Sequence, residues 1–278
     1  MSAPTLHRRA GEVVANRPLG AYRQLSVVLP ALATPARPGQ FVIVPPARAD
    51  HVLPRTWWVA GERTEAGFGT TLELVVPGTG ALPAPGEELQ LTGPVGRGFG
   101  LPTTPVTAVV AAQGAAGAAA RWLCELLRSV GCTVHLVSCA DEPEQHVDLV
   151  LARRSADGVV LTELGSAAAT LADLTHTLTP SVLYAAGPLS LSRTVALVAE
   201  RAGAVSQVSG VGIGAEGLCG HGLCGACDLP LRATAGRGAT VRPCADGPVL
   251  RGAVVDWAAV VDGDSVVAGD AVVEMGES

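Results

Sequence analysis

The sequence is poor in charge and has no cluster of basic residues. Charged residues make up 16% of the 278 residues, and the formal net charge is −6 at pH 7. Surfaces that bind nucleic acid or anionic membranes usually carry grouped Lys and Arg. The composition therefore argues against both kinds of partner.

Long apolar stretches are also absent. No uninterrupted run reaches the roughly 18 apolar residues of a membrane-spanning helix, so we expect none. Arg8 and Arg9 are not followed by the apolar segment of a signal peptide. Without a signal for export, we expect a cytoplasmic protein.

The residues that are present can build more than one core. Hydrophobic residues make up 48% of the chain, and 278 residues suit two domains plus a small module. Up to Gly100 the pattern is one of short β-rich runs between Gly and Pro turns. The expected strands are Leu25–Leu29, Gln40–Val44, Trp57–Ala60, Thr71–Val76 and Glu88–Thr92. This spacing predicts an antiparallel β-barrel or sandwich in residues 1–101, either a flavin-binding barrel or a plain β-module.

Beyond Thr103 strands alternate with helices, which predicts a parallel sheet with helical crossovers in residues 102–208. The expected strands are Val106–Ala111, Thr133–Ser138, Val147–Ala152, Val159–Thr162, Ser181–Ala185 and Ala204–Val208. The expected helices are Ala118–Ser129, Ala167–Thr177 and Ser190–Arg201, the last with Ser190 or Ser192 as its cap.

Two turns of this α/β region occupy the position where such sheets bind ligands, outside the carboxyl ends of the strands. One contains Gly114 and Gly117, and the other is Gly187-Pro188. The first offers two glycines where dinucleotide loops usually carry three. A nucleotide site and a purely structural α/β domain both remain open at this point.

The strongest chemical signal is a C-x4-C-x2-C-x16-C pattern. Glycines separate the first three cysteines and allow a tight loop, because glycine accepts positive φ and has no Cβ to clash with a cluster. The x4/x2 spacing is typical of plant-type [2Fe–2S] loops. A structural zinc site is the alternative, although zinc ribbons favour two short C-x2-C pairs. The expected ligands are Cys219, Cys224, Cys227 and Cys244, in a module spanning residues 209–252.

The remaining cysteines and the C-terminal tail have simpler interpretations. Cys124, Cys132 and Cys139 lie in apolar surroundings and are expected to be buried thiols. Residues 253–278 contain two β-like runs, Ala253–Val260 and Ser265–Val273, and predict a β-structured tail.

Several motifs resemble those of one protein family, and they occur in the same order along the chain. The cluster loop Gly217–Cys227 and the closing segment Cys244–Val249 (CADGPV) are the most specific of them. Weaker matches are Arg37–Val42, Gly93–Phe99 and Tyr184–Pro188. Together they make the chain similar to the electron-transfer subunit of the two-subunit, NAD-linked (class 1B) dihydroorotate dehydrogenase, a branch of the ferredoxin–NADP reductase-like superfamily.

The resemblance implies a relay of electrons rather than acid–base catalysis. A partner catalytic subunit with FMN would oxidise dihydroorotate, in pyrimidine biosynthesis. Electrons would then pass singly through a [2Fe–2S] cluster to FAD, and as hydride to NAD+. The two kinds of subunit would form a heterotetramer, and this chain would be a redox subunit with no catalytic residue of its own. His221 is expected to face solvent rather than to bind iron.

The resemblance also implies cofactor-binding residues, with departures at two of them. Arg55, Gly78 and Thr79 would hold FAD, while Gly114, Gly187 and Pro188 would border NAD. The family's R-P-x-S/T strand reads Arg55-Thr56-Trp57-Trp58 here, and an indole cannot replace a hydroxyl at flavin N5.

These departures leave four alternatives for the flavin strand. Thr56 takes over the hydroxyl's role with a shifted register, Trp58 stacks on or displaces the ring, flavin binding is weakened or lost, or both tryptophans are barrel core. In the nucleotide loop, alanines replace glycines where the backbone should approach the pyrophosphate. The second functional hypothesis is therefore a flavin-free iron–sulfur binding subunit that retains the scaffold.

Overall fold

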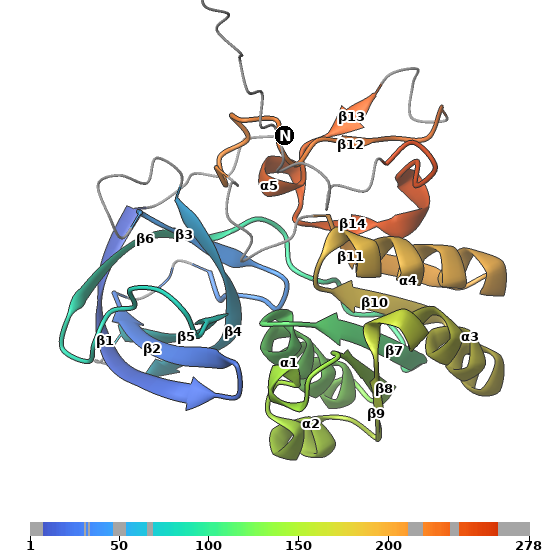
Figure 1. Ribbon diagram of the computed structural model, residues 1–278, viewed down its shortest axis with the longest axis horizontal. Coiled ribbons are helices and arrows are strands. Elements are labelled where there is room, and N and C mark those ends of the chain that lie inside the picture. The colour runs from blue at the N-terminus through green and yellow to red at the C-terminus, as the bar shows by residue number, and fades with distance from the viewer. Residues whose placement is uncertain are drawn as a thin grey trace, which may run out of the picture.

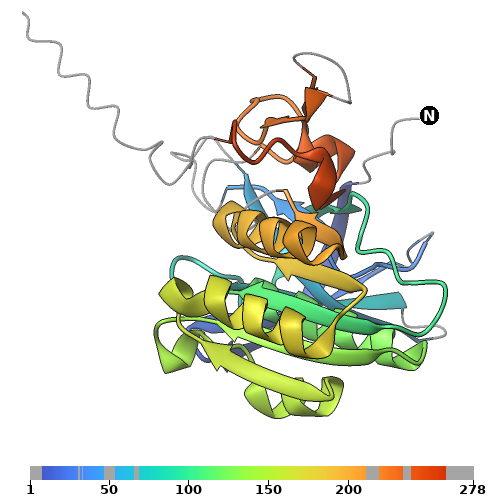
Figure 2. The same ribbon diagram turned by 90° about the vertical axis from the view of Figure 1, so that its right-hand side faces the viewer.

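The computed structural model describes residues 8–30, 32, 34–46, 54–65, 69–210, 219–233 and 239–260. A β-barrel and a helix-covered sheet lie side by side, and a small module with little regular structure lies against both (Figures 1 and 2). The predicted fold class, a barrel followed by a parallel α/β unit, is confirmed.

The barrel is closed and antiparallel, with strand order β1-β2-β5-β4-β3-β6. Its strands are β1 (Arg8–Leu19), β2 (Tyr22–Leu29), β3 (Phe41–Val44), β4 (Arg55–Glu65), β5 (Gly69–Pro77) and β6 (Glu88–Val95). Alternate residues of β2 point inward, as its period-two pattern predicts. All five expected strands are present. β1 was not predicted, because only two of its residues, Gly11 and Val13, are buried and its polar residues show no regular alternation.

The second unit is a six-stranded sheet of order β14-β11-β10-β7-β8-β9. The parallel strands are β7 (Thr107–Gln113), β8 (Thr133–Cys139), β9 (Gly158–Thr162), β10 (Val182–Ala186) and β11 (Val205–Ser209). The central strands β7 and β10 are apolar and buried almost throughout, as strands covered on both faces must be.

Four helices cover the sheet: α1 (Ala116–Ser129), α2 (Leu149–Ser155), α3 (Ala167–Leu178) and α4 (Leu189–Ala202). Buried residues of α1 and α2 pack with one set of alternate β7 residues, and those of α3 and α4 with the other. The two pairs therefore cover opposite faces. Short 3-10 turns, η1 (Pro143–Gln145) and η2 (Leu164–Ser166), complete the connections.

Two local predictions in this unit are wrong. Val147–Ala152 is not a strand, because the Asp148 carboxylate accepts the N–H of Leu151 at 3.2 Å and starts α2. No serine caps α4, whose first helical residue follows Pro188. Ser192 instead donates its hydroxyl to the carbonyl of Ser209 at 2.6 Å inside the protein.

The third part contains the described residues of the cysteine module. Its elements are β12 (Leu229–Pro230), β13 (Thr240–Val241), α5 (Pro243–Asp246), β14 (Val249–Arg251) and η4 (Gly252–Val254). β14 pairs antiparallel with β11 and so joins the module to the edge of the α/β sheet. The sequence pattern did not identify this strand.

The end of the chain differs from its prediction where the structure describes it. Residues 252–254 form η4 and residues 257–259 a turn, in place of the expected β-run over 253–260. The indole N–H of Trp257 donates to the carbonyl of Gly252 at 2.7 Å, which favours this compact return over an extended strand. The second expected run, 265–273, and the motif residues Gly217 and Leu218 lie outside the described residues.

One set of buried side chains belongs to all three parts, and we call it the shared core. Among its members are Phe41, Ile43, Trp58, Phe99, Tyr184, Cys219, Cys227 and Cys244. The described residues of the module are therefore packed into the junction of the barrel and the sheet.

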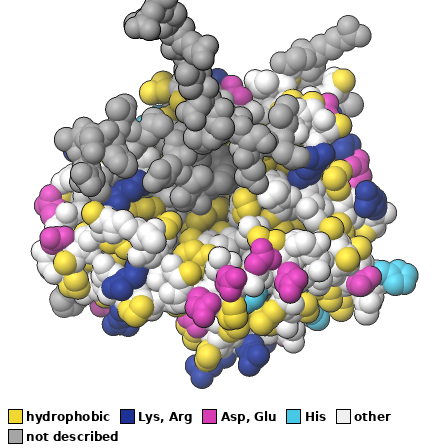
Figure 3. Space-filling model, in the orientation of Figure 1, with side chains coloured by type: hydrophobic (Ala, Val, Ile, Leu, Met, Phe, Trp, Pro, Cys, Tyr) yellow, Lys and Arg dark blue, Asp and Glu magenta, His cyan; other side chains and the backbone are white. Residues whose placement is uncertain are grey.

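The surface agrees with the composition. On the face shown in Figure 3, the described Arg side chains are scattered among acidic ones and form no continuous patch. Among the described helices, none combines the length and apolar character needed to span a bilayer.

Candidate functional site

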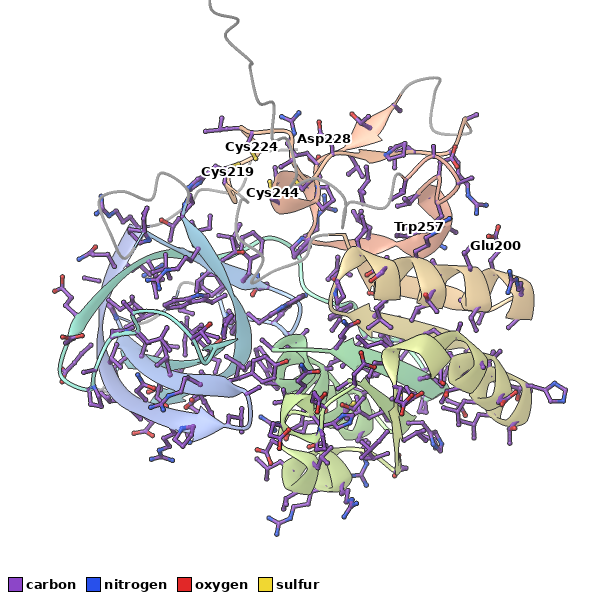
Figure 4. All side chains as sticks on the ribbon, viewed as in Figure 1. Glu200, Cys219, Cys224, Asp228, Cys244 and Trp257 are labelled. Carbon is purple, nitrogen blue, oxygen red and sulfur yellow. The ribbon has the colours of Figure 1, made fainter. Side chains whose placement is uncertain are left out.

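The four predicted ligands come from one loop and one short helix. Cys219, Cys224 and Cys227 lie in the loop before β12, and Cys244 lies in α5. The labelled Cys219, Cys224 and Cys244 lie near one another beside α5 (Figure 4). The N–H of Gly222, in the middle of the loop, donates to Cys244 Sγ at 3.2 Å. Cys244 is thus within reach of the loop despite its distance in sequence.

The Cys219 sulfur is surrounded by backbone donors. The N–H groups of His221, Leu223 and Cys224 point at Cys219 Sγ, with N···S distances of 3.4, 3.3 and 3.4 Å. Burial by itself raises the pKa of this thiol, but these three donors and the Cys224 side chain together lower it to about 6. The loop therefore favours the thiolate, which is the form that binds metal.

The sulfurs interact in two pairs. The Cys224 thiol contributes to lowering the pKa of Cys219, and the Cys227 thiol contributes to raising the pKa of Cys244. Burial, and then the hydrogen bond and charge of Cys227, raise the pKa of Cys244 to about 12. Within the described ranges, no three His, Cys, Asp or Glu side chains converge closely enough to hold one metal ion.

This donor set fits a [2Fe–2S] cluster. Such a cluster takes four cysteine ligands over two irons, and backbone N–H groups around the sulfurs adjust its potential. Cys219, Cys227 and Cys244 are buried, while Cys224 is exposed. His221 is exposed, as predicted.

The loop packs directly on the barrel. A Cβ added at Gly220 would lie 2.7 Å from Cδ1 and from Cγ1 of Ile43, and 3.5 Å from Cε2 of Phe41. Phe41 is paired with Trp58 of the neighbouring strand β4. Strand β3 therefore connects the cysteine loop to β4, the predicted flavin strand.

Arg55, at the start of β4, retains an unused donor. Its Nη1 donates to the carbonyl of Ala81 at 3.0 Å, and its guanidinium carbon lies 4.8 Å from the centroid of the Trp57 ring. Arg55 Nε is buried without a hydrogen-bond partner among the described residues. Burial lowers the pKa of Arg55. A buried unpaired guanidinium donor fits an anionic group such as a flavin diphosphate.

The segment after β5 fits the same end of a flavin. Gly78 and Thr79 are exposed. Shortly after them, the carbonyl of Ala81 accepts the hydrogen bond from the Arg55 guanidinium. Gly80 has φ +90° and no atom within 4 Å of an added Cβ. Arg55 therefore contacts, through Ala81, the segment that carries Gly78 and Thr79. The space is open beside Gly80, whereas a Cβ at Gly78 would lie 2.6 Å from the carbonyl oxygen of Ala21.

The ring end of the predicted flavin site does not match the family pattern. Thr56, Trp57 and Trp58 are all buried, at 2%, 3% and 1% exposure. Trp57 belongs to the barrel interior, and Trp58 belongs to the shared core. The prediction that both tryptophans are barrel core therefore holds for Trp57. Trp58 instead packs where the barrel, the sheet and the cysteine module meet. The position of the family's hydroxyl is occupied by a buried indole.

The two predicted nucleotide turns adjoin each other. Gly114 follows β7 and Gly187 follows β10, and these strands pair in parallel. A Cβ at Gly187 would lie 3.2 Å from Cβ of Gln113. Pro188 then precedes α4. Both turns are at the carboxyl end of the sheet, where open α/β sheets bind ligands.

The first turn leads into a helix suited to an anion. Gly114 has φ +68°, and Ala115 provides no side-chain cap for α1. An uncapped helix N-terminus after such a turn can accept a phosphate. The hydroxyl of Tyr22 from the barrel lies 3.6 Å from where a Cβ at Gly114 would be. The residues present therefore fit the diphosphate of a dinucleotide.

Sequence reasoning missed residues that position these sites. Ser209 holds the second turn, donating to the carbonyl of Gly187 at 2.8 Å and accepting its N–H at 3.3 Å. Arg242 and Asp228 form a bidentate ion pair beside the cysteine loop. The sequence offers one signal for this ion pair: Asp228 directly follows Cys227, and Arg242 lies two residues before Cys244.

Comparison with known proteins agrees with this arrangement. No family model matches the chain. The probable dihydroorotate dehydrogenase B (NAD(+)), electron transfer subunit, of Methanopyrus kandleri is 32% identical over 225 residues, covering 76% of this chain and 78% of that protein.

Two solved structures share the fold. The NADH-dependent reduced ferredoxin–NADP oxidoreductase has a TM-score of 0.69 at 23% identity, over 89% of this chain and 90% of that one. The ferredoxin reductase in carbazole 1,9a-dioxygenase has a TM-score of 0.56 at 20% identity, over 71% and 64%.

At these identities the structures support the barrel-plus-sheet fold, and the curated relative establishes the family. The chain belongs to the electron transfer subunits of dihydroorotate dehydrogenase B.

Proposed function

We propose that this chain passes electrons between the FMN-containing catalytic subunit of a dihydroorotate dehydrogenase and NAD+, within pyrimidine biosynthesis. The observation that carries the proposal is the set of backbone N–H groups that the cysteine loop directs at Cys219 Sγ and Cys244 Sγ, in a member of this family. As a redox subunit, the chain needs no acid–base residue of its own.

The metal-binding role falls to Cys219, Cys224, Cys227 and Cys244. A bound [2Fe–2S] cluster accepts and donates single electrons, and a flavin links them to two-electron hydride transfer. The protein supplies preformed donors: the N–H groups aimed at Cys219 stabilise its thiolate before metal arrives. The burial of three of the cysteines limits solvent access.

For FAD, Arg55, Gly78 and Thr79 bind the diphosphate. The unpaired Nε of Arg55 is the donor available to it. On this strand Thr56, Trp57 and Trp58 would lie behind the wall of the binding site, because they are buried at 2%, 3% and 1% exposure. For NAD, Gly114 receives the pyrophosphate at the start of α1, while Gly187 and Pro188 border the nicotinamide.

The assembly implied by the family is a complex with the catalytic subunit, as a cytoplasmic heterotetramer. The parts correspond to a flavin-binding domain (1–101), a NAD-binding domain (102–208), a cluster module (209–252) and a tail (253–278). Sedimentation of the co-expressed subunits tests the stoichiometry.

The second candidate is a flavin-free iron–sulfur subunit. The buried indole at Trp58 is the observation in its favour, because no hydroxyl is offered to the flavin ring there. The family to which the chain belongs favours the flavin-linked function.

One preparation discriminates the candidates. Protein purified without oxygen is assayed for iron, sulfide, zinc and flavin, and for NADH-dependent dye reduction. Two irons, two sulfides and one FAD, with dye reduction, are expected. A cluster without flavin would support the flavin-free subunit. Colourless protein containing zinc would indicate a zinc-braced interaction module.

The ligand set has its own test. Cys224→Ser should lose the cluster's visible absorption, whereas Cys139→Ser, at a buried thiol of β8 outside the site, should retain it. Full iron content in Cys224→Ser would refute the assignment of that ligand.

A further inference from the structure

Arg242 contacts every segment that carries a predicted ligand. Its Nε and Nη2 donate to the two carboxylate oxygens of Asp228, at 2.6 and 2.8 Å, next to Cys227. Its Nη1 donates to the carbonyl of Gly222 at 2.6 Å, between Cys219 and Cys224. Arg242 itself lies two residues before Cys244. The guanidinium therefore links the Gly222 carbonyl and the Asp228 carboxylate to the segment that carries Arg242 and Cys244.

The contact with Gly222 leads to a ligand sulfur. The Gly222 carbonyl belongs to the same peptide group as the N–H of Leu223, and that N–H donates to Cys219 Sγ at 3.3 Å. The N–H of Gly222 donates to Cys244 Sγ. A cation on a peptide carbonyl polarises the peptide and strengthens the bond made by its N–H. The charge of Arg242 thus acts one peptide away from Cys219.

The positive charge of Arg242 and the negative charge of Asp228 cancel, so the pair carries almost no net charge. Arg242 and Asp228 are partly exposed, at 40% and 30% of their side-chain areas, so solvent and salt weaken but do not remove their fields. The potential of an iron–sulfur cluster depends on nearby charge and on hydrogen bonds to its sulfurs. Removing one partner of the pair leaves the charge of the other uncompensated.

We propose that Arg242 is a positioning residue that joins the ligand-bearing segments and, in balance with Asp228, sets the reduction potential of the cluster. The inference rests on the proposed function only in requiring that the cluster is bound. It assigns a role to a residue pair outside the ligand set.

The charge test compares two single variants and the double variant. Asp228→Asn leaves a positive guanidinium and should favour the reduced cluster. Arg242→Gln leaves a negative carboxylate and should favour the oxidised one. We expect opposite changes of roughly three- to tenfold in the ratio of reduced to oxidised cluster at fixed ambient potential, with tenfold equal to about 59 mV for one electron. The double variant should return towards wild type, and added salt should shrink both shifts.

The geometric test uses Arg242→Lys. Lysine retains the charge but cannot make the forked contacts with Asp228 and Gly222 together. We expect a potential near that of wild type, with faster loss of iron to a chelator. Electron paramagnetic resonance during redox titration reports the potential, and absorbance with chelator present reports iron release.

Arg232→Gln is the matched control. Arg232 makes a similar bidentate pair with Glu200 of α4, at 2.7 and 2.8 Å, in the same module, and its Nε donates to the carbonyl of Val255; none of these described bonds reaches the cysteine loop. In Figure 4 the labelled Glu200 lies away from the cysteines. Its loss should leave both the potential and iron release unchanged.

Several results would overturn the inference. Wild-type potential and iron release in Asp228→Asn and Arg242→Gln would do so. Shifts in one common direction, or equal shifts in Arg232→Gln, would point to general destabilisation instead. A wild-type chain that binds no iron would overturn the proposed function itself, so the two failures are distinguishable.

Discussion

Gly220 is the residue at which the cysteine loop meets the barrel. It has φ +70°, and an added Cβ would lie 2.7 Å from Ile43. Gly225 has a similar φ of +73°, but the nearest atom to its Cβ is 3.8 Å away. Alanine in a left-handed conformation costs about 1–2 kcal/mol at either position. We expect Gly220→Ala to destabilise the protein more than Gly225→Ala and to lower iron uptake, since Ile43 must also move.

Comparing Gly220→Ala with Gly225→Ala separates the effect of the contact with Ile43 from the effect of backbone strain, which both variants share. Urea unfolding and iron content are measured on both variants. Equal losses of unfolding free energy and iron content in the two variants would show that the loop does not pack closely against Ile43. Ile43→Val in the Gly220→Ala background should recover part of the difference.

Trp58 supplies the second prediction at this scale. Its indole is 1% exposed and belongs to the shared core of barrel, sheet and module. Trp58→Ala should cost about 3–5 kcal/mol of unfolding free energy, because it leaves a large cavity. Trp58→Phe should cost clearly less. Denaturant unfolding checks both, and a cost below about 1 kcal/mol for the alanine variant would show that the site collapses or lies at the surface.

At the scale of elements, the segment from β14 to Trp257 fixes the module to the sheet. A Cβ at Gly252 would lie 2.3 Å from Ser206 Oγ and 2.8 Å from Ala196 Cβ, so η4 packs closely on β11 and α4. Trp257 is buried and donates to the Gly252 carbonyl. The segment therefore holds the module through packing and one buried hydrogen bond.

Trp257→Phe should cost about 1–3 kcal/mol, because it leaves the Gly252 carbonyl without its donor. Trp257→Ala should cost more, about 3–5 kcal/mol, through the added cavity. Hydrogen exchange should rise first in residues 249–257 and leave the barrel strands protected. Uniform loss of protection across the barrel would contradict this local role.

The elements also show where sequence patterns predict correctly and where they do not. Short β-rich runs between Gly and Pro turns, several with period-two alternation, identified five of the barrel strands. The alternation is clear in β2, where one face is buried, but not in β3, which is buried throughout. Val147–Ala152 was apolar enough to resemble a strand, but the Asp148 cap starts a helix there. β14 is short and becomes a strand only because β11 offers an edge. Pairing with a distant edge leaves no local signal.

At the scale of the whole molecule, Gly100 joins the barrel to the sheet. Its carbonyl accepts from the Tyr184 hydroxyl and from Gln207 Nε2, each at 3.0 Å, and its N–H donates to Gln207 Oε1 at 2.8 Å. The Phe99 ring contacts Tyr184 edge-on, with centroids 5.7 Å apart. The side chains of Tyr184 and Gln207, both from the sheet, therefore hold Gly100 in the segment that follows the last barrel strand.

Because Tyr184 and Gln207 share one acceptor, their substitutions should not be additive. Tyr184→Phe and Gln207→Ala should each cost about 0.5–1.5 kcal/mol. The double variant should differ from their sum by at least about 0.5 kcal/mol in unfolding free energy. Additivity within error would mean that Gly100 is held by each side chain independently.

The sequence by itself determined the class of fold, and its cysteine spacing identified the four thiols that we propose as ligands. Alternation, turn residues and cysteine spacing are local patterns, and local patterns reflect the backbone geometry that their own residues adopt. They also placed Arg55, Gly114 and Gly187 in the turns and strand ends where the structure has them.

Only the tertiary structure decided how these residues combine. It brings Cys244 to the loop, packs Trp58 into a core shared by three parts, and sets Arg242 between Asp228 and Gly222. These contacts join segments far apart along the chain. The free energy of such contacts depends on distances and burial that exist only after folding, so no spacing in the sequence could encode them by itself.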